Sequence, residues 1–190
     1  NLPDIVQVST PSYNGTHVDG WHGAVRSMVE QLCTEKAEND GHINILPNMV
    51  SCEDVRHLFD ICEDFGLKAT ILPDISETLD GPALEDYMKI PATIELGRCV
   101  PAKSGGSSLA ERFGVANHRI GLPMGLRESD IFFETLEAIS GKEMPARYER
   151  ERGRLIDAYV DGHKYVFGKR AVVYGEEDLV TGLCAFLAEI

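Results

Sequence analysis

Two kinds of hydrophobic pattern alternate along this chain. Short runs rich in β-branched residues, bounded by glycine, proline or polar residues, predict buried strands. Between them, apolar side chains recur every three or four positions, which predicts amphipathic helices. Strands are expected at residues 5–9, 43–47, 67–72, 92–96 and 171–175, with a weaker candidate at 118–120. Helices are expected at residues 21–33, between 51 and 66, and at 108–113, 129–139, 145–165 and 178–189.

The second predicted helix carries clear boundary signals. Ser51 suits the N-cap position, and Glu53 and Asp54 place negative charge in the first turn, where the helix dipole favours it. Gly66 supplies the residue that commonly follows the end of a helix. Because this helix lies between two predicted strands, this part of the chain is expected to form consecutive β-α-β units.

Consecutive β-α-β units imply a parallel sheet with right-handed crossovers. The expected fold class is therefore α/β, with a Rossmann-like parallel sheet flanked by helices, followed by a connecting helix and the start of a further βα domain. We expect the Rossmann-like domain over residues 1–144, the connecting helix over 145–167, and the first βα unit of a truncated further domain over 168–190.

Any ligand site in such a fold is expected at one edge of the sheet, because open parallel sheets bind ligands beyond the carboxyl ends of their strands. In this chain the predicted strands lead into residues 11–20, 47–51 and 73–82. These three segments are the expected rim of a site.

The charge and hydrophobicity of the chain argue against two classes of partner, nucleic acids and membranes. A net charge of −13 repels phosphate backbones and anionic membranes, which argues against nucleic-acid binding. No apolar run approaches the roughly 20 residues that span a bilayer, and no export leader is visible, so we expect no membrane partner. The chain starts at Asn1, and its last residues still follow an apolar helix pattern, so we expect a segment of a longer protein.

The cysteines indicate a reducing compartment. There are five, they are widely spaced, and no two form a CxxC pair; they are Cys33, Cys52, Cys62, Cys99 and Cys184. Metal ligands usually come in close pairs, so a cluster or zinc site built from these five alone is not expected. We expect reduced thiols in a cytoplasmic protein.

Two further segments, one with histidines and one with adjacent glycines, have residue types that are found in ligand sites. His17 and His22 flank Asp19 on a loop, which would allow a metal or acid–base role, but the spacing matches no defined metal motif and favours structural hydrogen bonding. Gly105-Gly106 faintly resembles a phosphate loop but lacks both GxxxxGK(S/T) and GxGxxG, which argues against nucleotide binding.

The predicted connecting helix carries charged residues in two groups. Arg152 and Arg154 follow or flank glutamates, a pattern typical of a helix surface or subunit contact and not of catalysis. Asp157 and Asp161 are four residues apart, so both carboxylates project from one helix face. A hard cation would relieve their repulsion with oxygen ligands. The alternative is two solvated acids on a polar face.

Three separated blocks resemble the nitrogenase component 1 family, of the molybdenum-iron protein type, and they follow the family's order across nearly the whole chain. The first is Thr10-Pro11-Ser12-Tyr13-Asn14-Gly15-Thr16-His17 with Gly20 and Trp21, and the second is Leu72-Pro73-Asp74 with Leu79-Asp80-Gly81-Pro82. The third is Gly121-Leu122-Pro123-Met124-Gly125-Leu126, continuing through Asp130, Ser140-Gly141-Lys142, Pro145, Glu151-Arg152-Gly153-Arg154-Leu155-Ile156-Asp157, Asp161, His163 and Gly168-Lys169-Arg170.

The resemblance is strongest to the β chain, and it implies the family's middle domain, connecting helix and the start of its third domain. It implies a parent that reduces dinitrogen together with an α chain, a second β chain and an iron-protein reductase. The family's bridging iron–sulfur cluster is held mainly by cysteines upstream of Asn1, so this segment is expected to hold no cluster ligand and to be inactive alone. The resemblance also implies that Asp157 and Asp161 form an intersubunit cation site, for calcium or iron, completed by another chain.

Two departures from the β-chain pattern keep alternatives open. The stretch from Pro82 to Ala92 is shorter than the family's and lacks its Gly-Gly-Thr element, either by deletion or because residues are missing. Asp19-Gly20 followed by Ala24-Val25 is more similar to the cofactor-assembly scaffold relatives. The scaffold chain is therefore an alternative to the catalytic β chain, and a small-molecule-binding α/β module fits the periodicity without the motifs.

Overall fold

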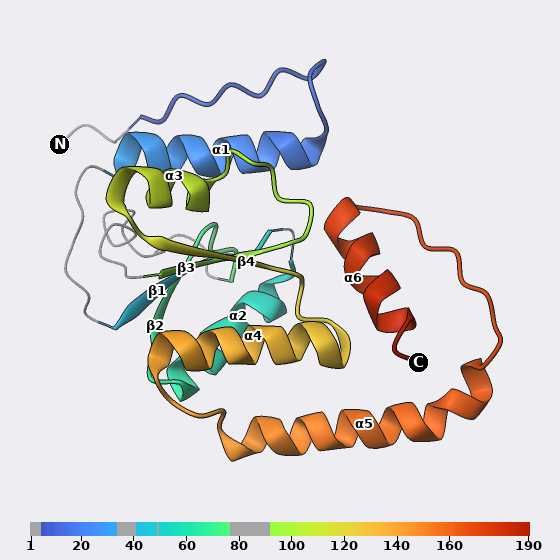
Figure 1. Ribbon diagram of the computed structural model, residues 1–190. Coiled ribbons are helices and arrows are strands. Elements are labelled where there is room, and N and C mark those ends of the chain that lie inside the picture. Colours follow the sequence, from blue (N-terminus) through green and yellow to red (C-terminus); the bar gives the residue numbers. More distant parts are fainter. Residues whose placement is uncertain (1–4, 34–40, 49, 77–91) are drawn as a thin grey trace. The chain divides into compact units, whose positions relative to one another are not determined.

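The computed structural model describes residues 5–33, 41–48, 50–76 and 92–190 (Figure 1). Within these residues the helices are α1 (His17–Leu32), α2 (Cys52–Asp64), α3 (Gly105–Phe113), α4 (Gly125–Ser140), α5 (Ala146–Val166) and α6 (Glu177–Leu187). The strands are β1 (His42–Leu46), β2 (Lys68–Ile71), β3 (Ala92–Leu96) and β4 (Ala116–Ile120). No helix among the described residues is both long enough and apolar enough to cross a membrane.

The chain forms two compact units. Unit 1 comprises the described residues of Asn1–Leu96 and Val100–Arg119, and unit 2 comprises Gly97–Cys99 and Ile120–Ile190. These units are defined by contacts within this chain, and they do not establish the domain boundaries of a longer protein. The expected division into 1–144, 145–167 and 168–190 therefore stays a prediction.

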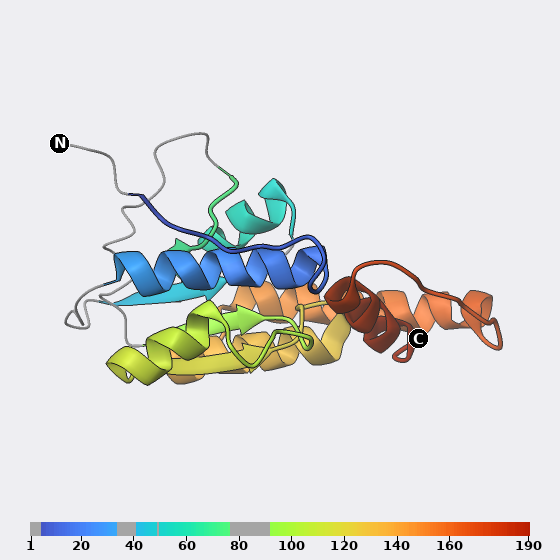
Figure 2. The ribbon, with the colours of Figure 1, turned by 90° about the horizontal axis from the view of Figure 1, so that it is seen from above.

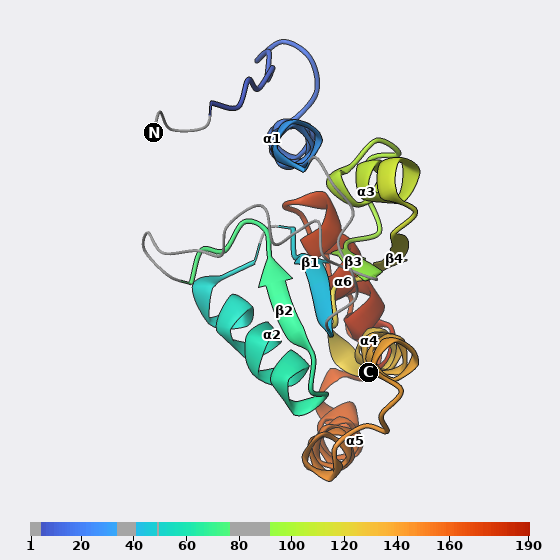
Figure 3. The same ribbon diagram turned by 90° about the vertical axis from the view of Figure 1, so that its left-hand side faces the viewer.

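Unit 1 is built on a sheet with strand order β2-β1-β3-β4. The strand β1 pairs in parallel with β2 on one side and with β3 on the other, and Ile45 lies opposite both Ile71 and Ile94. All three isoleucines are fully buried. The helices α1 and α3 lie side by side over one face of the sheet, and α2 covers the other face (Figures 2 and 3). The expected α/β fold, a Rossmann-like parallel sheet flanked by helices, is confirmed.

Local hydrogen bonds explain where the helices of unit 1 begin. Ser51 caps α2 through a reciprocal pair of hydrogen bonds with Asp54, as the sequence predicted, and Gly66 follows the helix with a φ of 69°. The helix α1 begins before the expected residue 21 because Thr16 and Asp19 form a second capping box. The helix α3 begins at Gly105, because Ser104 caps it.

The first predicted strand, residues 5–9, is wrong. These residues form an extended segment outside the sheet, and Ile5 is 87% exposed. The amide and carbonyl of Gln7 are bonded by the side chain of Gln31, at 2.9 and 2.8 Å, and not by a neighbouring strand. A β-branched run predicts extended backbone, but a strand also needs a partner for its hydrogen bonds.

The predicted strand at residues 171–175 is also wrong. Its residues have no regular secondary structure, and Val172 and Tyr174 are 90% and 92% exposed. In the described part of the chain no strand pairs with this segment, so its backbone has no ladder to join. The expected βα unit at 168–190 therefore consists of an extended segment followed by the predicted helix, which is α6.

Unit 2 contains the helices α4, α5 and α6 (Figure 1). The helix predicted from residue 145 to about 165 is confirmed as α5, and its role as a connection between domains stays a prediction. The stretch from Leu79 to Pro82 and the shortened segment that precedes Ala92 lie outside the described residues, so the expectations placed on them stay predictions.

Candidate functional site

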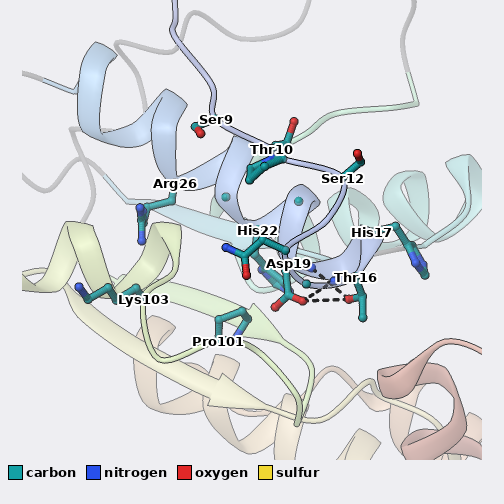
Figure 4. A pocket seen from close by; sticks show the side chains of 15 residues that line it. Ser9, Thr10, Ser12, Thr16, His17, Asp19, His22, Arg26, Pro101 and Lys103 are labelled. Carbon is teal, nitrogen blue, oxygen red and sulfur yellow. Dashed lines mark hydrogen bonds between the residues drawn. The ribbon is translucent and has the colours of Figure 1, made fainter.

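A pocket of about 580 Å³ lies in unit 1, at the amino-terminal half of α1 (Figure 4). One wall is the segment from Ser9 to His17, which leads into the helix. The floor is the first turns of α1, which contribute Asp19, His22 and Arg26. The other wall comes from the segment that follows β3 and carries Pro101 and Lys103.

The first wall is held by the cap of α1. The carboxylate of Asp19 accepts hydrogen bonds from the amide of Thr16 at 2.7 Å and from its hydroxyl at 3.1 Å. The bond from the backbone amide is the main reason that the pKa of Asp19 is lowered, and the hydroxyl adds to it. Gly15 has a φ of +90°, and a Cβ there would lie 2.6 Å from the Asp19 carboxylate. The loop therefore requires glycine at this position.

The two histidines of this loop lie in different surroundings. His22 is 5% exposed, and its ring packs edge to face against Trp21, with centroids 4.8 Å apart. His17 is exposed and points away from His22 and Asp19 (Figure 4). Among the residues with described positions, no three His, Cys, Asp or Glu side chains converge as metal ligands. The arrangement favours the structural interpretation of these residues.

Hydroxyl and cationic groups line the remainder of the pocket. Ser9, Thr10 and Ser12 contribute hydroxyls to the wall formed by residues 9–17. Arg26 and Lys103 both lie at the left side of the pocket in Figure 4. Arg26 also forms an ion pair with Glu30, at 3.4 Å. These groups offer hydrogen bonds and positive charge to a polar ligand or to a polar segment of another chain.

The sequence predicted only part of this pocket. Residues 11–20 line it, as expected for the rim, but the segment 47–51 does not contribute. The sequence analysis did not include Pro101 and Lys103 in the rim, although both follow a predicted strand and so meet the criterion used for the other segments. They follow the carboxyl end of β3, the edge at which open parallel sheets bind ligands.

The Gly105-Gly106 turn has a partner within the chain. The amide of Gly106 donates to the buried carboxylate of Glu95, at 3.0 Å, so an anion already lies at the amino-terminal end of α3. A phosphate at this place would have to displace that carboxylate.

The predicted cation ligands, Asp157 and Asp161, are both exposed on α5, one turn apart. No third acidic, histidine or cysteine side chain joins them within the described parts of the chain. On the same helix, Arg152 forms a two-pronged ion pair with Asp130 of α4, at 2.7 and 2.8 Å, and Arg154 pairs with Glu151 at 2.6 Å. Both arginines thus form ion pairs on the helix surface, and the prediction that they are not catalytic stays a prediction.

The five cysteines are all free thiols, and they divide into two classes. Burial raises the pKa of Cys62 to about 12 and that of Cys33 to about 11. Cys52, Cys99 and Cys184 are exposed, and partial desolvation raises the pKa of Cys99. Since the thiolate is the reactive form, we expect iodoacetamide at pH 8 to alkylate Cys52 and Cys184 roughly 100-fold faster than Cys33 and Cys62. Mass spectrometry of a labelling time course measures this, and equal rates at all four sites would contradict it.

Comparisons with known proteins cover the whole chain. A sequence model of the family described as nitrogenase component 1 type oxidoreductase matches residues 1–190. The nitrogenase molybdenum-iron protein beta chain of Clostridium pasteurianum is 30% identical over 98% of this chain and 44% of its own length. The nitrogenase iron-molybdenum cofactor biosynthesis protein NifN of Bradyrhizobium diazoefficiens is also 30% identical, over 98% of this chain and 44% of its own length.

A solved structure supports the same relation. The structure of nitrogenase Cp1 at pH 6.5 superposes with a TM-score of 0.88 at 30% sequence identity, covering 97% of this chain and 43% of that chain. The chain thus spans less than half the length of the relatives that it matches.

Proposed function

Because the chain belongs to the nitrogenase component 1 type oxidoreductase family, we propose that it is the part of a β-type chain that supports the fold and a subunit interface. In this proposal the whole protein reduces dinitrogen together with an α chain, a second β chain and an iron-protein reductase. The iron–sulfur cluster is bound by residues outside this segment. The segment contributes no catalytic group of its own.

The surface of α5 supports the interface role. Asp157 and Asp161 are exposed one turn apart, and the neighbouring Val160 is 71% exposed. Phe167, which follows the helix, is 76% exposed. Exposed large apolar side chains are typical of sites of association, and a cation or a basic partner would relieve the mild repulsion between two carboxylates one turn apart. These features support the proposal of a subunit contact that includes a metal ion.

Calcium and ferrous iron both fit the proposed pair. Calcium takes six to eight oxygen ligands in proteins, and two carboxylates supply at most four. Water can supply the remaining ligands on this chain alone, and in the proposed assembly another chain replaces part of that water with its own oxygen ligands. We expect weak binding to this chain alone and tight binding at the subunit contact.

The test is calorimetric titration of the metal-stripped assembly, purified from cells that make the complete protein with its partner chains, with calcium and then manganese. The double variant Asp157→Asn/Asp161→Asn is expected to weaken binding at least about 100-fold, because the site loses its charged ligands. The matched control is Asp60→Asn/Asp64→Asn, which alters an acidic pair of the same spacing on α2 and is expected to leave the affinity unchanged. Unchanged binding in the first variant would refute the metal assignment.

A second candidate function is that of the cofactor-assembly scaffold chain. It is favoured because the NifN relative matches this chain with the same identity and the same coverage as the molybdenum-iron protein β chain. The two functions are separated by activity. The catalytic β-type chain is expected to support dinitrogen reduction when its assembly is supplied with reductase, whereas a scaffold is expected to release its cofactor to a cofactor-free nitrogenase instead.

A further inference from the structure

A charged side chain lies buried in the middle of unit 1. Glu95 is on β3, an inner strand of the sheet, and is 2% exposed. Its carboxylate accepts three hydrogen bonds: from the Gly106 amide at 3.0 Å, the Asn117 side chain at 2.8 Å and the Arg119 guanidinium at 3.0 Å. A buried carboxylate is tolerated only with such partners. Glu95 therefore joins β3, β4 and the start of α3.

The guanidinium of Arg119 extends this network to the pocket. Its second nitrogen donates to the Ser104 hydroxyl at 2.8 Å and to the carbonyl oxygens of Pro101 at 3.0 Å and Ala102 at 3.4 Å. The fork of an arginine fixes the position of several acceptors at once. The Nε of Arg119 donates to Glu95, and its Nη2 donates to the segment that forms a pocket wall.

The absence of a side chain at Gly106 leaves room for the Glu95 carboxylate at the start of α3. A Cβ on Gly106 would lie 2.6 Å from the carboxyl carbon of Glu95 and 2.6 Å from the Asn117 amide oxygen. Only glycine lets the α3 amide approach the carboxylate this closely. The same turn follows Ser104, the cap of α3, which is fully buried. The carboxylate and the guanidinium thus lie at the point where the wall segment joins the helix.

We propose that Glu95 and Arg119 form a positioning clamp for the pocket, which holds residues 101–104 in place and so fixes Pro101 and Lys103 opposite α1. The Glu95–Arg119 clamp acts through backbone carbonyls and a capping serine and touches no ligand itself. Its role does not depend on what the pocket binds, and it stands apart from the proposed subunit contact on α5.

The test is amide hydrogen exchange, followed by mass spectrometry of peptides covering residues 100–108, on the full chain. Glu95→Gln weakens the ion pair and Arg119→Lys removes the fork, because a lysine ammonium cannot reach Glu95 and the three wall oxygens together. In both variants we expect exchange in 100–108 to rise at least about tenfold, while peptides from β1 and α2 change less than twofold.

Arg112 supplies the matched control. Its guanidinium also joins α3 to backbone carbonyls, those of Val29, Glu30 and Cys33 at the far end of α1. Arg112→Lys is expected to leave exchange in 100–108 within twofold of the unmodified chain. The clamp is overturned if exchange in 100–108 rises as much in Arg112→Lys as in the clamp variants, because the effect would then follow overall stability. It is equally overturned if neither clamp variant raises exchange there.

Discussion

An alanine in place of Glu95 is expected to lower the free energy of unfolding of unit 1 by about 3 kcal/mol, because it removes the acceptor of three hydrogen bonds and leaves the Arg119 guanidinium without its counter-ion. Breaking a fully buried ion pair costs roughly 3–5 kcal/mol. The lower end applies here, since the Arg119 side chain is 34% exposed and water can partly solvate it.

The single tryptophan of the chain makes this effect measurable. Trp21 lies on α1 of unit 1, so its fluorescence during urea unfolding reports that unit. Glu95→Gln keeps the size and the acceptor oxygen, and it is expected to cost less than Glu95→Ala. Glu63→Ala, on the exposed surface of α2, should change the unfolding free energy by less than about 0.5 kcal/mol. A loss at Glu95 no larger than that at Glu63 would refute the structural role of the buried carboxylate.

The second large effect is expected in unit 2, where Gly125→Ala should cost about 2–4 kcal/mol. Gly125 begins α4 with a φ of +77°, a conformation that costs an L-residue roughly 1–2 kcal/mol. A Cβ there would also lie 2.6 Å from the carboxylate of Glu189. That carboxylate accepts from the amides of Leu126 and Arg127, at 2.8 and 3.0 Å, and from the Tyr159 hydroxyl at 3.0 Å. Displacing it would leave the start of α4 uncapped, since Met124 provides no side-chain cap.

Gly141 is the matched control for this prediction. It follows the same helix at its other end with a φ of +69°, but a Cβ there would meet no atom within 4 Å. Gly141→Ala therefore carries the backbone cost alone and should lose about 1–2 kcal/mol. Urea unfolding followed by far-ultraviolet circular dichroism compares the two variants. Equal losses would show that the contact with Glu189 contributes nothing beyond the backbone conformation.

These contacts give a physical account of the Gly121–Leu126 block by which the sequence resembles its family. A Cβ at Gly121 would collide with the carboxylate of Glu128, which pairs with Arg98 at 2.8 Å. Gly125 makes room for Glu189 in the same way. Each glycine lets a carboxylate approach the backbone. In this block, Gly121 and Gly125 each let a carboxylate lie close to the backbone near the start of α4. Packing within unit 2 therefore explains why the block has glycine at these two positions.

The sequence alone determined the elements whose stabilising contacts are local. The helix α2 lies where Ser51 and Gly66 placed it, because a cap and a left-handed terminal residue act within one turn of the chain. The strands β1 and β3 could be predicted because nearly all of their residues are buried, on both faces of the sheet. The resemblance blocks likewise identified the family before any fold was known.

Only the tertiary structure decided which extended segments become strands and which charges lie inside. Residues 5–9 and 171–175 have the composition of strands, but strand pairing is a contact between distant segments and leaves no local signal. Glu95 and Arg119 are 24 residues apart, and Glu189 caps a helix that begins 64 residues earlier in the sequence. A charge in a sequence records neither its burial nor its partner, because both depend on what the fold brings beside it.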